Sequence, residues 1–308
     1  MEKFIKLWHH LSMMMKSEKH TILETLKQGR EHLKSAGIDT FDIDAKVLLS
    51  FVTGMQHHEF IAHPDTVLNV CMYRKYMKLI NRRMKAEPVA QITGEKEFWS
   101  LPFKVSKGTL IPRPESETIV EAVKSEFKNP TTQYKILDMG TGTGCLLLSI
   151  LSEYKNSVGI GIDVRHNPIK TARENAKKLN LYDRAKIMKL SWYSKKPTKK
   201  IAEQKFHIIV SNPPYITECD MKKLSDDVRK YEHRQALYGG RDGLDEYRQI
   251  SKALYYWDIL DDNGKIFLEI GKGQHEDVRK IFEAFGFKFR HYFNDIAGVV
   301  RVVEFSKK

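Results

Sequence analysis

The 308-residue chain has few cysteines and no long apolar run, and both absences narrow what it can be. The three cysteines, Cys71, Cys145 and Cys219, lie far apart and form no C-x-x-C pair. This spacing excludes a zinc ribbon and argues for a reducing compartment. No apolar run approaches the ~18 residues that would cross a bilayer, so we expect no membrane span.

We expect neither a targeting segment nor a metal site in this sequence. Residues 1–20 contain acidic as well as basic side chains, and they have neither a small-residue cleavage site nor the Arg-rich composition of a transit peptide. We therefore expect a cytoplasmic protein. The pairs His9-His10 and His57-His58 are expected to lie on the surface, because adjacent helical positions point about 100° apart and do not chelate a metal from one face.

Acidic residues are in the minority. The 52 Lys+Arg against 39 Asp+Glu leave a formal charge of +13, and the pI is near 9.4. Such an excess is compatible with a nucleic-acid partner. Lysine on a solvated face explains it equally well, so the charge leaves both interpretations open.

Residues 20–86 have the apolar spacing of helices. The stretch Phe41–Val52 places its apolar side chains on one face, and Gly54 is suited to end that helix. A longer helix is predicted over Thr66–Ala86. Because no catalytic constellation occurs here, we predict a small helical substrate-recognition domain over residues 1–86.

Residues 87–114 change character and are interpreted as a hairpin linker. Glu87-Pro88 stops the preceding helix, and Phe98–Val105 alternates in the manner of strands. Two prolines in Ile111-Pro112-Arg113-Pro114-Glu115 hold the backbone extended before the next region.

From Tyr134 onwards, short apolar strands alternate with helices. Strands are predicted at 135–139, 158–162, 185–190, 207–211 and 265–270 with two more at the end, and helices from about 144 and at 168–179, 244–260 and 275–285. This alternation predicts an α/β fold, a doubly wound and mostly parallel sheet, over residues 115–308. Ligands bind at the carboxyl ends of such strands.

A glycine-rich loop follows the first predicted strand of this sheet. Asp138-Met139-Gly140-Thr141-Gly142-Thr143-Gly144 allows a tight turn and a close approach of the backbone to a ligand. Cys145 stands where the G-x-G-x-x-G dinucleotide fingerprint needs glycine. D-x-G-x-G-x-G is instead typical of S-adenosylmethionine-dependent methyltransferases. Asp163 ends the next strand, 19 residues past Gly144, where an acid accepts ribose hydroxyls.

A second motif, Asn212-Pro213-Pro214-Tyr215, ends the fourth strand of the sheet. Two prolines at a strand end make the backbone stiff and donate no hydrogen bond. The Asn212 side-chain oxygen and the Pro213 carbonyl can each accept one N–H from a planar nitrogen, and Tyr215 can stack on the flat group. The motif therefore predicts methylation of an amide or exocyclic amine held about 3 Å from the transferred methyl. It does not separate glutamine from adenine.

Several motifs together resemble the release-factor glutamine methyltransferases, the HemK/PrmC family. These are Glu87-Pro88 with Ile92-Thr93-Gly94, Ile111–Glu115, the glycine loop, Ser211–Ile216 and Gly239-Gly240-Arg241-Asp242-Gly243-Leu244. DNA adenine methyltransferases share Asn-Pro-Pro-Tyr, but not the helical bundle and the Pro-Arg-Pro junction. The combination is specific, and it covers most of the chain.

The resemblance implies methyl transfer from S-adenosylmethionine to the N5 amide of the glutamine in the Gly-Gly-Gln loop of peptide chain release factors. By this matching, the residues from Gly140 to Gly144, with Asp163, Trp192 and Asn212, contact the cofactor. Asn212, Pro213, Pro214 and Tyr215 hold the glutamine, and Asn212, Pro213 and Tyr215 are the catalytic set. Four residues depart from the family pattern: Ser191 replaces an acid, Gln91 a tyrosine, His233 a proline and Glu246 an aromatic residue.

Two other functions remain open at this point. One is a nucleic-acid adenine N6-methyltransferase, and the other is a ribosome- or RNA-binding module with a vestigial pocket. We favour the protein substrate, with no membrane, metal or direct nucleic-acid contact and with a monomeric chain. Residues 165–205 hold 13 basic and 3 acidic side chains, so we interpret them as a basic patch that steers an acidic protein partner.

Overall fold

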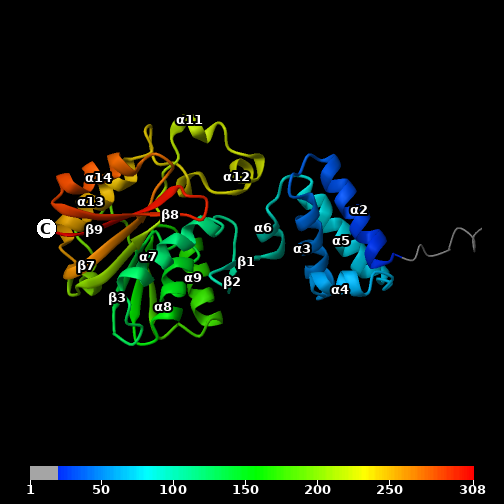
Figure 1. Cartoon of the computed structure of the whole chain (residues 1–308), viewed down its shortest axis with the longest axis horizontal. Helices are drawn as coiled ribbons and strands as arrows, with labels where there is room; N and C mark the ends of the chain where they lie inside the picture. The colour runs from blue at the N-terminus through cyan, green and yellow to red at the C-terminus, as the bar shows by residue number, and fades with distance from the viewer. Residues whose placement is uncertain (1–19) are drawn as a thin grey trace, which may run out of the picture. The chain divides into compact units, whose positions relative to one another are not determined.

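The computed structural model describes residues 20–308, and Figure 1 shows its helices and strands. The expectations for the start of the chain, including His9 and His10, lie outside the described residues. The chain divides into two compact units between Thr93 and Gly94. Within residues 20–308, none of the helices combines the length and the apolar character needed to cross a membrane.

The first unit is helical, as the apolar spacing predicts. It contains α2 (Ile22–Ser35), α3 (Phe41–Thr53), α4 (His57–Ala62), α5 (Val70–Arg83) and α6 (Val89–Thr93). Leu48, Leu49 and Tyr76 are fully buried where α3 and α5 pack together. The helix predicted from Thr66 begins at Val70 instead, because the Asn69 side chain caps it by accepting a 2.8 Å hydrogen bond from the Met72 amide.

A two-stranded hairpin opens the second unit. Strands β1 (Glu95–Phe98) and β2 (Leu101–Lys104) are joined by Trp99 and Ser100, which both have positive φ, as a tight two-residue turn requires. Phe98 and Phe103 are buried in the core of this unit. The segment that we interpreted as one linker is thus divided, with α6 in the first unit and the hairpin in the second.

The rest of the second unit is built on a seven-stranded sheet in the order β5-β4-β3-β6-β7-β9-β8. The strands are β3 (Lys135–Met139), β4 (Val158–Asp163), β5 (Ala185–Lys189), β6 (Phe206–Ser211), β7 (Leu260–Glu269), β8 (Phe287–Asn294) and β9 (Val300–Lys307). The first five strands in this order are parallel, and β9 and β8 pair antiparallel. The predicted α/β fold with a doubly wound, mostly parallel sheet is confirmed.

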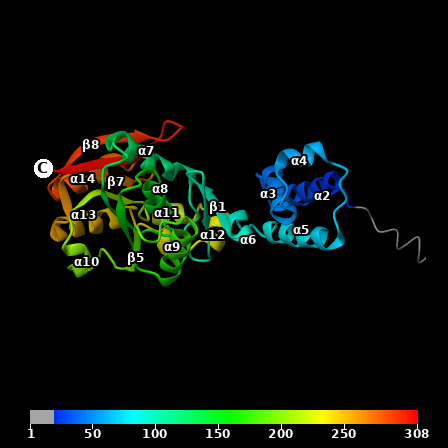
Figure 2. The same ribbon diagram turned by 90° about the horizontal axis from the view of Figure 1, so that it is seen from below.

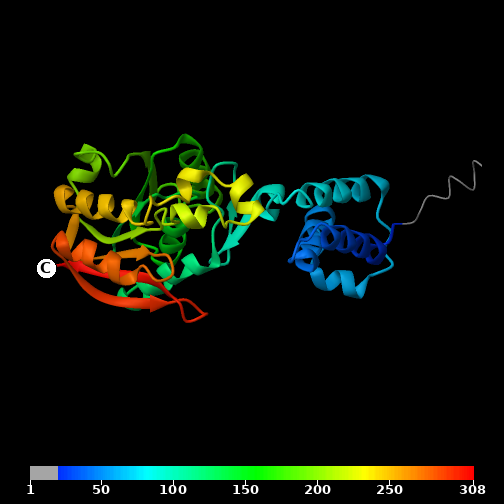
Figure 3. The same ribbon diagram turned by 90° about the horizontal axis from the view of Figure 1, so that it is seen from above.

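Helices cover both faces of the sheet. Helices α7 (Glu117–Glu126), α8 (Cys145–Glu153) and α9 (His166–Lys178) lie on one face, and α13 (Asp245–Trp257) and α14 (His275–Ala284) on the other (Figures 1, 2 and 3). Along β3, Ile136 is buried with the first set and Leu137 with the second. This alternation leaves both faces apolar, as a buried parallel strand requires.

Some elements differ from their predicted bounds. Strand β7 begins at Leu260, five residues before the prediction, and α13 ends at Trp257, because Asp258 takes the left-handed conformation. The sequence pattern did not predict α7, nor the short helices α10 (Lys199–Ala202), α11 (Glu218–Met221) and α12 (Asp226–Tyr231). Nor did it predict two 3-10 turns, Pro114–Ser116 and Arg234–Ala236. Short turns of this kind have too few residues to show a periodicity.

Candidate active site

The glycine loop lies where β3 and β4 end side by side. The Gly140 and Thr141 amides both donate to the Ile162 carbonyl at 2.9 Å, which ties the loop to the neighbouring strand. Gly140 has φ +82°, and a side chain there would come within 3.3 Å of the Trp192 ring. Glycine is therefore required at this position by conformation and by space.

Two carboxylates support the loop. Asp138 is fully buried, and one of its oxygens accepts the Thr141 hydroxyl at 2.6 Å, while the other has no hydrogen-bond partner among the described residues. Burial raises the pKa of Asp138 to about 7. Asp163 accepts the Gly142 amide at 3.2 Å and the Arg165 amide at 3.0 Å, one on each oxygen. Each carboxylate oxygen has a further lone pair, so Asp163 can still accept hydroxyl donors.

A cavity of about 390 Å³ opens beside the loop. Six of the predicted site residues line it: Gly140, Gly142, Asp163, Trp192, Asn212 and Pro214. Val164, Arg165, Tyr193, Arg234, Tyr238 and Glu246 are among the residues that complete the wall, and none of these six was in the predicted set. A volume of this size is typical of a small-molecule or cofactor site.

Three predicted cofactor residues do not line the cavity. The Thr141 hydroxyl donates its hydrogen bond to Asp138. The Thr143 carbonyl accepts a hydrogen bond from the Asn175 side-chain amide at 2.8 Å. Gly144 packs against Ala172 at the start of α8. These residues shape the loop from behind, and their predicted contact with the cofactor stays a prediction.

A second, smaller cavity of about 140 Å³ lies beside the first. Asn212, Pro213, Pro214 and Tyr215 line it together with Arg113 of the Pro-Arg-Pro segment. The two cavities share Leu110, Asn212, Pro214 and Ala236. Of these four, Asn212 alone belongs to both the predicted cofactor residues and the predicted substrate residues, and it alone has a polar side chain.

The Asn-Pro-Pro-Tyr segment is held by hydrogen bonds to neighbouring elements. The Ser211 hydroxyl donates to the Met139 carbonyl at 2.6 Å, which joins the ends of β6 and β3. The Asn212 side-chain N–H donates to the Ser116 hydroxyl at 3.0 Å, and the Tyr215 hydroxyl donates to Glu269 at 3.2 Å. The Tyr215 hydroxyl thus points into the protein, and its burial raises the pKa of the phenol well above the usual value.

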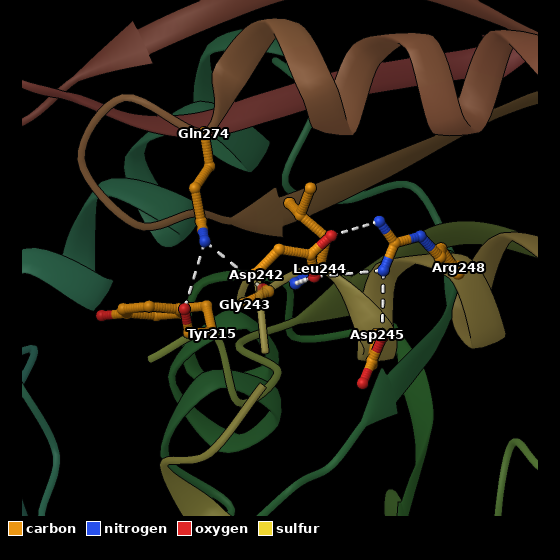
Figure 4. Close-up of polar contacts among 7 residues, drawn as sticks. All are labelled: Tyr215, Asp242, Gly243, Leu244, Asp245, Arg248 and Gln274. Carbon is orange, nitrogen blue, oxygen red and sulfur yellow. Dashed lines mark hydrogen bonds and ion pairs between the residues drawn. The ribbon is translucent and has the colours of Figure 1, made fainter. Parts of the chain in front are cut away.

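The glycine-rich motif at residues 239–244 has a structural explanation. Figure 4 shows the Gln274 side chain bridging the carbonyls of Tyr215 and Gly243, at 3.1 and 3.3 Å. A side chain at Gly243 would lie 2.4 Å from the Tyr215 carbonyl oxygen. Arg248 closes the same loop through ion pairs with Asp242 and Asp245. The motif therefore lets two loops pack backbone against backbone beneath the acceptor segment.

The remaining sequence hypotheses concern thiols and metals. Burial raises the pKa of Cys145 to about 12, so this thiol is a packing group rather than a nucleophile. Within residues 20–308, no three or more His, Cys, Asp or Glu side chains gather to hold a metal ion.

The larger cavity fits a nucleoside cofactor such as S-adenosylmethionine. Asp163 offers carboxylate oxygens to ribose hydroxyls, and Gly140 and Gly142, which have no side chains, line the same cavity. Val164, Trp192 and Tyr193 supply apolar surface of the kind that packs on a base. No phosphate-binding lysine or P-loop accompanies the glycines.

Family models match both units of the chain. A model of the PrmC N-terminal domain matches residues 24–94, and a model of the methyltransferase small domain matches residues 115–228. The second of these models, together with the glycine loop and the doubly wound sheet, defines the second unit as a Rossmann-like methyltransferase domain. Among solved structures, the hMettl16 catalytic domain in complex with a 3'UTR hairpin has a TM-score of 0.56 at 14% identity, over 84% of this chain and 91% of that chain. That likeness concerns the fold alone.

Curated relatives show to which family of methyltransferases the chain belongs. The chain is 38% identical over 285 residues to the release factor glutamine methyltransferase of Clostridium botulinum. The aligned region covers 92% of this chain and 98% of the relative. The chain is 34% identical over 304 residues to the bifunctional methyltransferase of Rickettsia typhi. That aligned region covers 93% of this chain and 57% of the relative. The chain thus spans little more than half of that longer relative. It belongs to the release factor glutamine methyltransferase family, and the predicted resemblance is confirmed.

Proposed function

We propose that the chain transfers a methyl group from S-adenosylmethionine to the side-chain amide nitrogen of the glutamine in the Gly-Gly-Gln loop of peptide chain release factors. The position of Asn212 at the junction of the two cavities carries this proposal. One side chain that borders both a cofactor-sized and an amide-sized space is what direct transfer between two ligands requires. We further propose that the enzyme acts in the cytoplasm, where its substrate is used.

The acceptor nitrogen is a poor nucleophile, because its lone pair is conjugated with the carbonyl. S-adenosylmethionine supplies a methyl group on a positively charged sulfur, which leaves as a neutral thioether. In the transfer, the carbon–sulfur bond breaks as the carbon–nitrogen bond forms, and the nitrogen then loses one proton to solvent. No strong base is required beforehand, so the task of the protein is to orient the amide.

Asn212 and its neighbours are suited to that task. The Asn212 N–H faces Ser116, so its side-chain oxygen is free to accept an N–H of the substrate amide. Pro213 and Pro214 have no N–H of their own and line the smaller cavity. Tyr215 presents a ring whose hydroxyl is already bonded to Glu269. These residues hold a planar amide without competing donors.

The test is methylation of a purified release factor with radiolabelled S-adenosylmethionine. We expect labelling of the native factor, and none when its loop glutamine is changed to alanine. Equal labelling of both forms would contradict the proposal. Duplex DNA and RNA are assayed in parallel, and methylation of nucleic acid that falls steeply with salt would favour the adenine N6 alternative.

A further inference from the structure

Glu269 is a buried carboxylate beneath the acceptor segment that the mechanism above leaves without a role. It is the last residue of β7 and is 1% exposed. Strand β7 lies next to β6, so its carboxyl end lies beside the start of Asn-Pro-Pro-Tyr. The Glu269 side chain accepts the Tyr215 hydroxyl at 3.2 Å.

The same carboxylate reaches Asn212 through Ser116. The Ser116 hydroxyl lies near Glu269 and lowers the pKa of its carboxyl group, and the Oε2 atom of Glu269 has no hydrogen-bond partner among the described residues. A serine hydroxyl has only one proton, so when that proton points toward the unpartnered carboxylate oxygen, the serine oxygen can only accept. What it accepts is the Asn212 N–H, at 3.0 Å. This polarity turns the Asn212 nitrogen toward Ser116 and leaves the Asn212 oxygen for the substrate.

Tyr215 is held on two sides by the segment that follows β7. A side chain at Gly271 would come within 3.1 Å of the Tyr215 ring, and Gln274 donates to the Tyr215 carbonyl. At the far end of the ring, Glu269 accepts a hydrogen bond from the Tyr215 hydroxyl. Glu269 therefore holds the hydroxyl end of the Tyr215 ring, and Gln274 holds the Tyr215 backbone.

We propose that Glu269, as a carboxylate, is the positioning residue of the acceptor site, and that it orients Asn212 through Ser116 and Tyr215 directly. This inference rests on the proposed function, since it concerns how the same site holds its amide. Glu269 does not touch the reacting atoms. Its negative charge is what makes both hydroxyls donate toward it, and this fixes the direction of each hydrogen bond in the network.

The ionisation of Glu269 is coupled to these contacts. Burial raises the pKa of Glu269 to about 7, although the Ser116 and Tyr215 hydroxyls and the charge of Arg301 lower it. A protonated Glu269 has a donor of its own, which competes with the two hydroxyls. Transfer should therefore weaken as pH falls below about 7. The other ionisable groups around Glu269 are Glu115, Cys145 and Tyr247, whose hydroxyl donates to the Glu269 backbone carbonyl. Arg301 in turn pairs with Asp295, and Arg113 acts on Tyr215.

The decisive variant is Glu269→Gln in the full chain, assayed with the release factor. We expect kcat to fall by about 100-fold, with KM for the release factor and Kd for S-adenosylmethionine within about threefold of the wild type, because orientation and not binding is lost. The wild-type kcat should decline below about pH 7, whereas the variant should show no such decline. Glu304→Gln removes another buried carboxylate from the same sheet, on β9, and should keep both kcat and the pH profile.

Stability separates positioning from a purely structural role. A buried carboxyl with a raised pKa makes the folded state less stable as pH rises, because it must ionise in the folded protein. Glutamine has no charge to bury, so at pH 8 Glu269→Gln should unfold at a temperature no lower than that of the wild type. Wild-type kcat in Glu269→Gln, or an unchanged acidic decline in that variant, would overturn the inference. Loss of kcat together with lower stability at pH 8 would also overturn it, in favour of a structural role.

Two further variants keep the inference falsifiable if Glu269→Gln does not fold. Ser116→Ala and Tyr215→Phe each remove one donor to the carboxylate, so each should lower kcat and move the acidic decline to higher pH. An unmoved decline in both would contradict the inference. Asp138, whose pKa is also about 7, underlies the cofactor loop, so its titration is followed separately in the pH dependence of cofactor binding. If the wild type does not label the release factor at all, the proposed function fails instead.

Discussion

The indole N–H of Trp192 donates a 2.7 Å hydrogen bond to Glu246, and the same carboxylate accepts the Tyr193 hydroxyl at 3.0 Å. All three residues line the larger cavity. Glu246 stands where the family pattern has an aromatic residue, and Ser191 stands where it has an acid. In this chain a carboxylate on α13 thus anchors the two aromatic side chains of the cofactor wall.

We predict that Glu246→Ala weakens S-adenosylmethionine binding by about tenfold, which corresponds to ~1.4 kcal/mol, because both aromatic side chains lose their anchor. The change in Kd is measured by titration calorimetry. Glu246→Gln keeps one acceptor oxygen and should lie between the wild type and the alanine variant. An unchanged Kd in Glu246→Ala would mean that Trp192 and Tyr193 are held by packing alone.

We predict that Asn212→Ala lowers kcat by orders of magnitude while Kd for the cofactor stays within about tenfold. The reason is that Asn212 supplies the acceptor oxygen for the substrate amide, whereas most of the cofactor wall is built by other residues. Single-turnover methylation and equilibrium binding are measured on the same preparation. Near-normal turnover would refute the role assigned to Asn212.

We predict that Gly243→Ala lowers kcat by about tenfold or more, because its Cβ would lie 2.4 Å from the Tyr215 carbonyl oxygen and must displace the acceptor segment. Gly286→Ala is the matched control. Gly286 also has positive φ, at +84°, but nothing lies within 4 Å of the added Cβ. It should lose only about 1 kcal/mol of stability through backbone strain and keep its kcat. Equal activity in the two variants would exclude the steric explanation.

Arg113 and Glu232 form an ion pair between the Pro-Arg-Pro segment and the residue that follows α12. The Glu232 side chain is 1% exposed, and burial raises its pKa above the ordinary 4.5 although Arg113 lowers it. Arg113→Ala removes the lowering contribution, so the pKa of Glu232 rises further and the cost of its charge grows with pH.

We therefore predict that Arg113→Ala lowers the free energy of unfolding by about 1–3 kcal/mol at pH 8 and by less at pH 5, because the raised pKa of Glu232 favours its neutral form as the pH falls. Urea unfolding at the two pH values checks this, and Arg113→Ala/Glu232→Gln should recover most of the loss at pH 8. A loss that is the same at both pH values would show that the charge of Glu232 is not its cause.

Lys195, Lys196, Lys199 and Lys200 belong to the basic patch, and all four are exposed. Changing them to glutamine should slow association with the release factor by roughly tenfold at low salt, with little change at high salt or in kcat. The matched control neutralises four other exposed lysines, Lys252, Lys272, Lys280 and Lys288. A salt-independent loss of turnover, or the same loss in the control, would reject the steering role.

Local pattern predicted most of the catalytic unit. Apolar runs marked the strands of the parallel sheet. The glycine loop and Asn212 each follow a strand directly and Asp163 ends one, so the rule for carboxyl ends placed them together. The same rule applied to β7 would have drawn attention to Glu269, which ends that strand. Ser116 and Arg113 lie in the Pro-Arg-Pro-Glu-Ser stretch, whose prolines indicated only a stiff junction.

The pairings that complete the site could not be predicted in this way. Ser116 and Asn212 are 96 residues apart, Tyr215 and Glu269 are 54 apart, and Arg113 and Glu232 are 119 apart. Each pairing depends on which strands are neighbours and on how the loops after them fold back. Helix propensity and apolar periodicity act over a few residues and contain no information at those separations.

By itself the sequence determined the fold class and the strand ends that hold the glycine loop and Asn-Pro-Pro-Tyr, and it predicted a planar nitrogen as the methyl acceptor. Those features follow from local conformational preference and from the donors and acceptors of each side chain. Only the tertiary structure decided that β7 lies beside β6 and that Glu246 comes under Trp192. The physical reason is that a buried polar group must find its partner wherever the folded chain brings one, and strand order sets where that is.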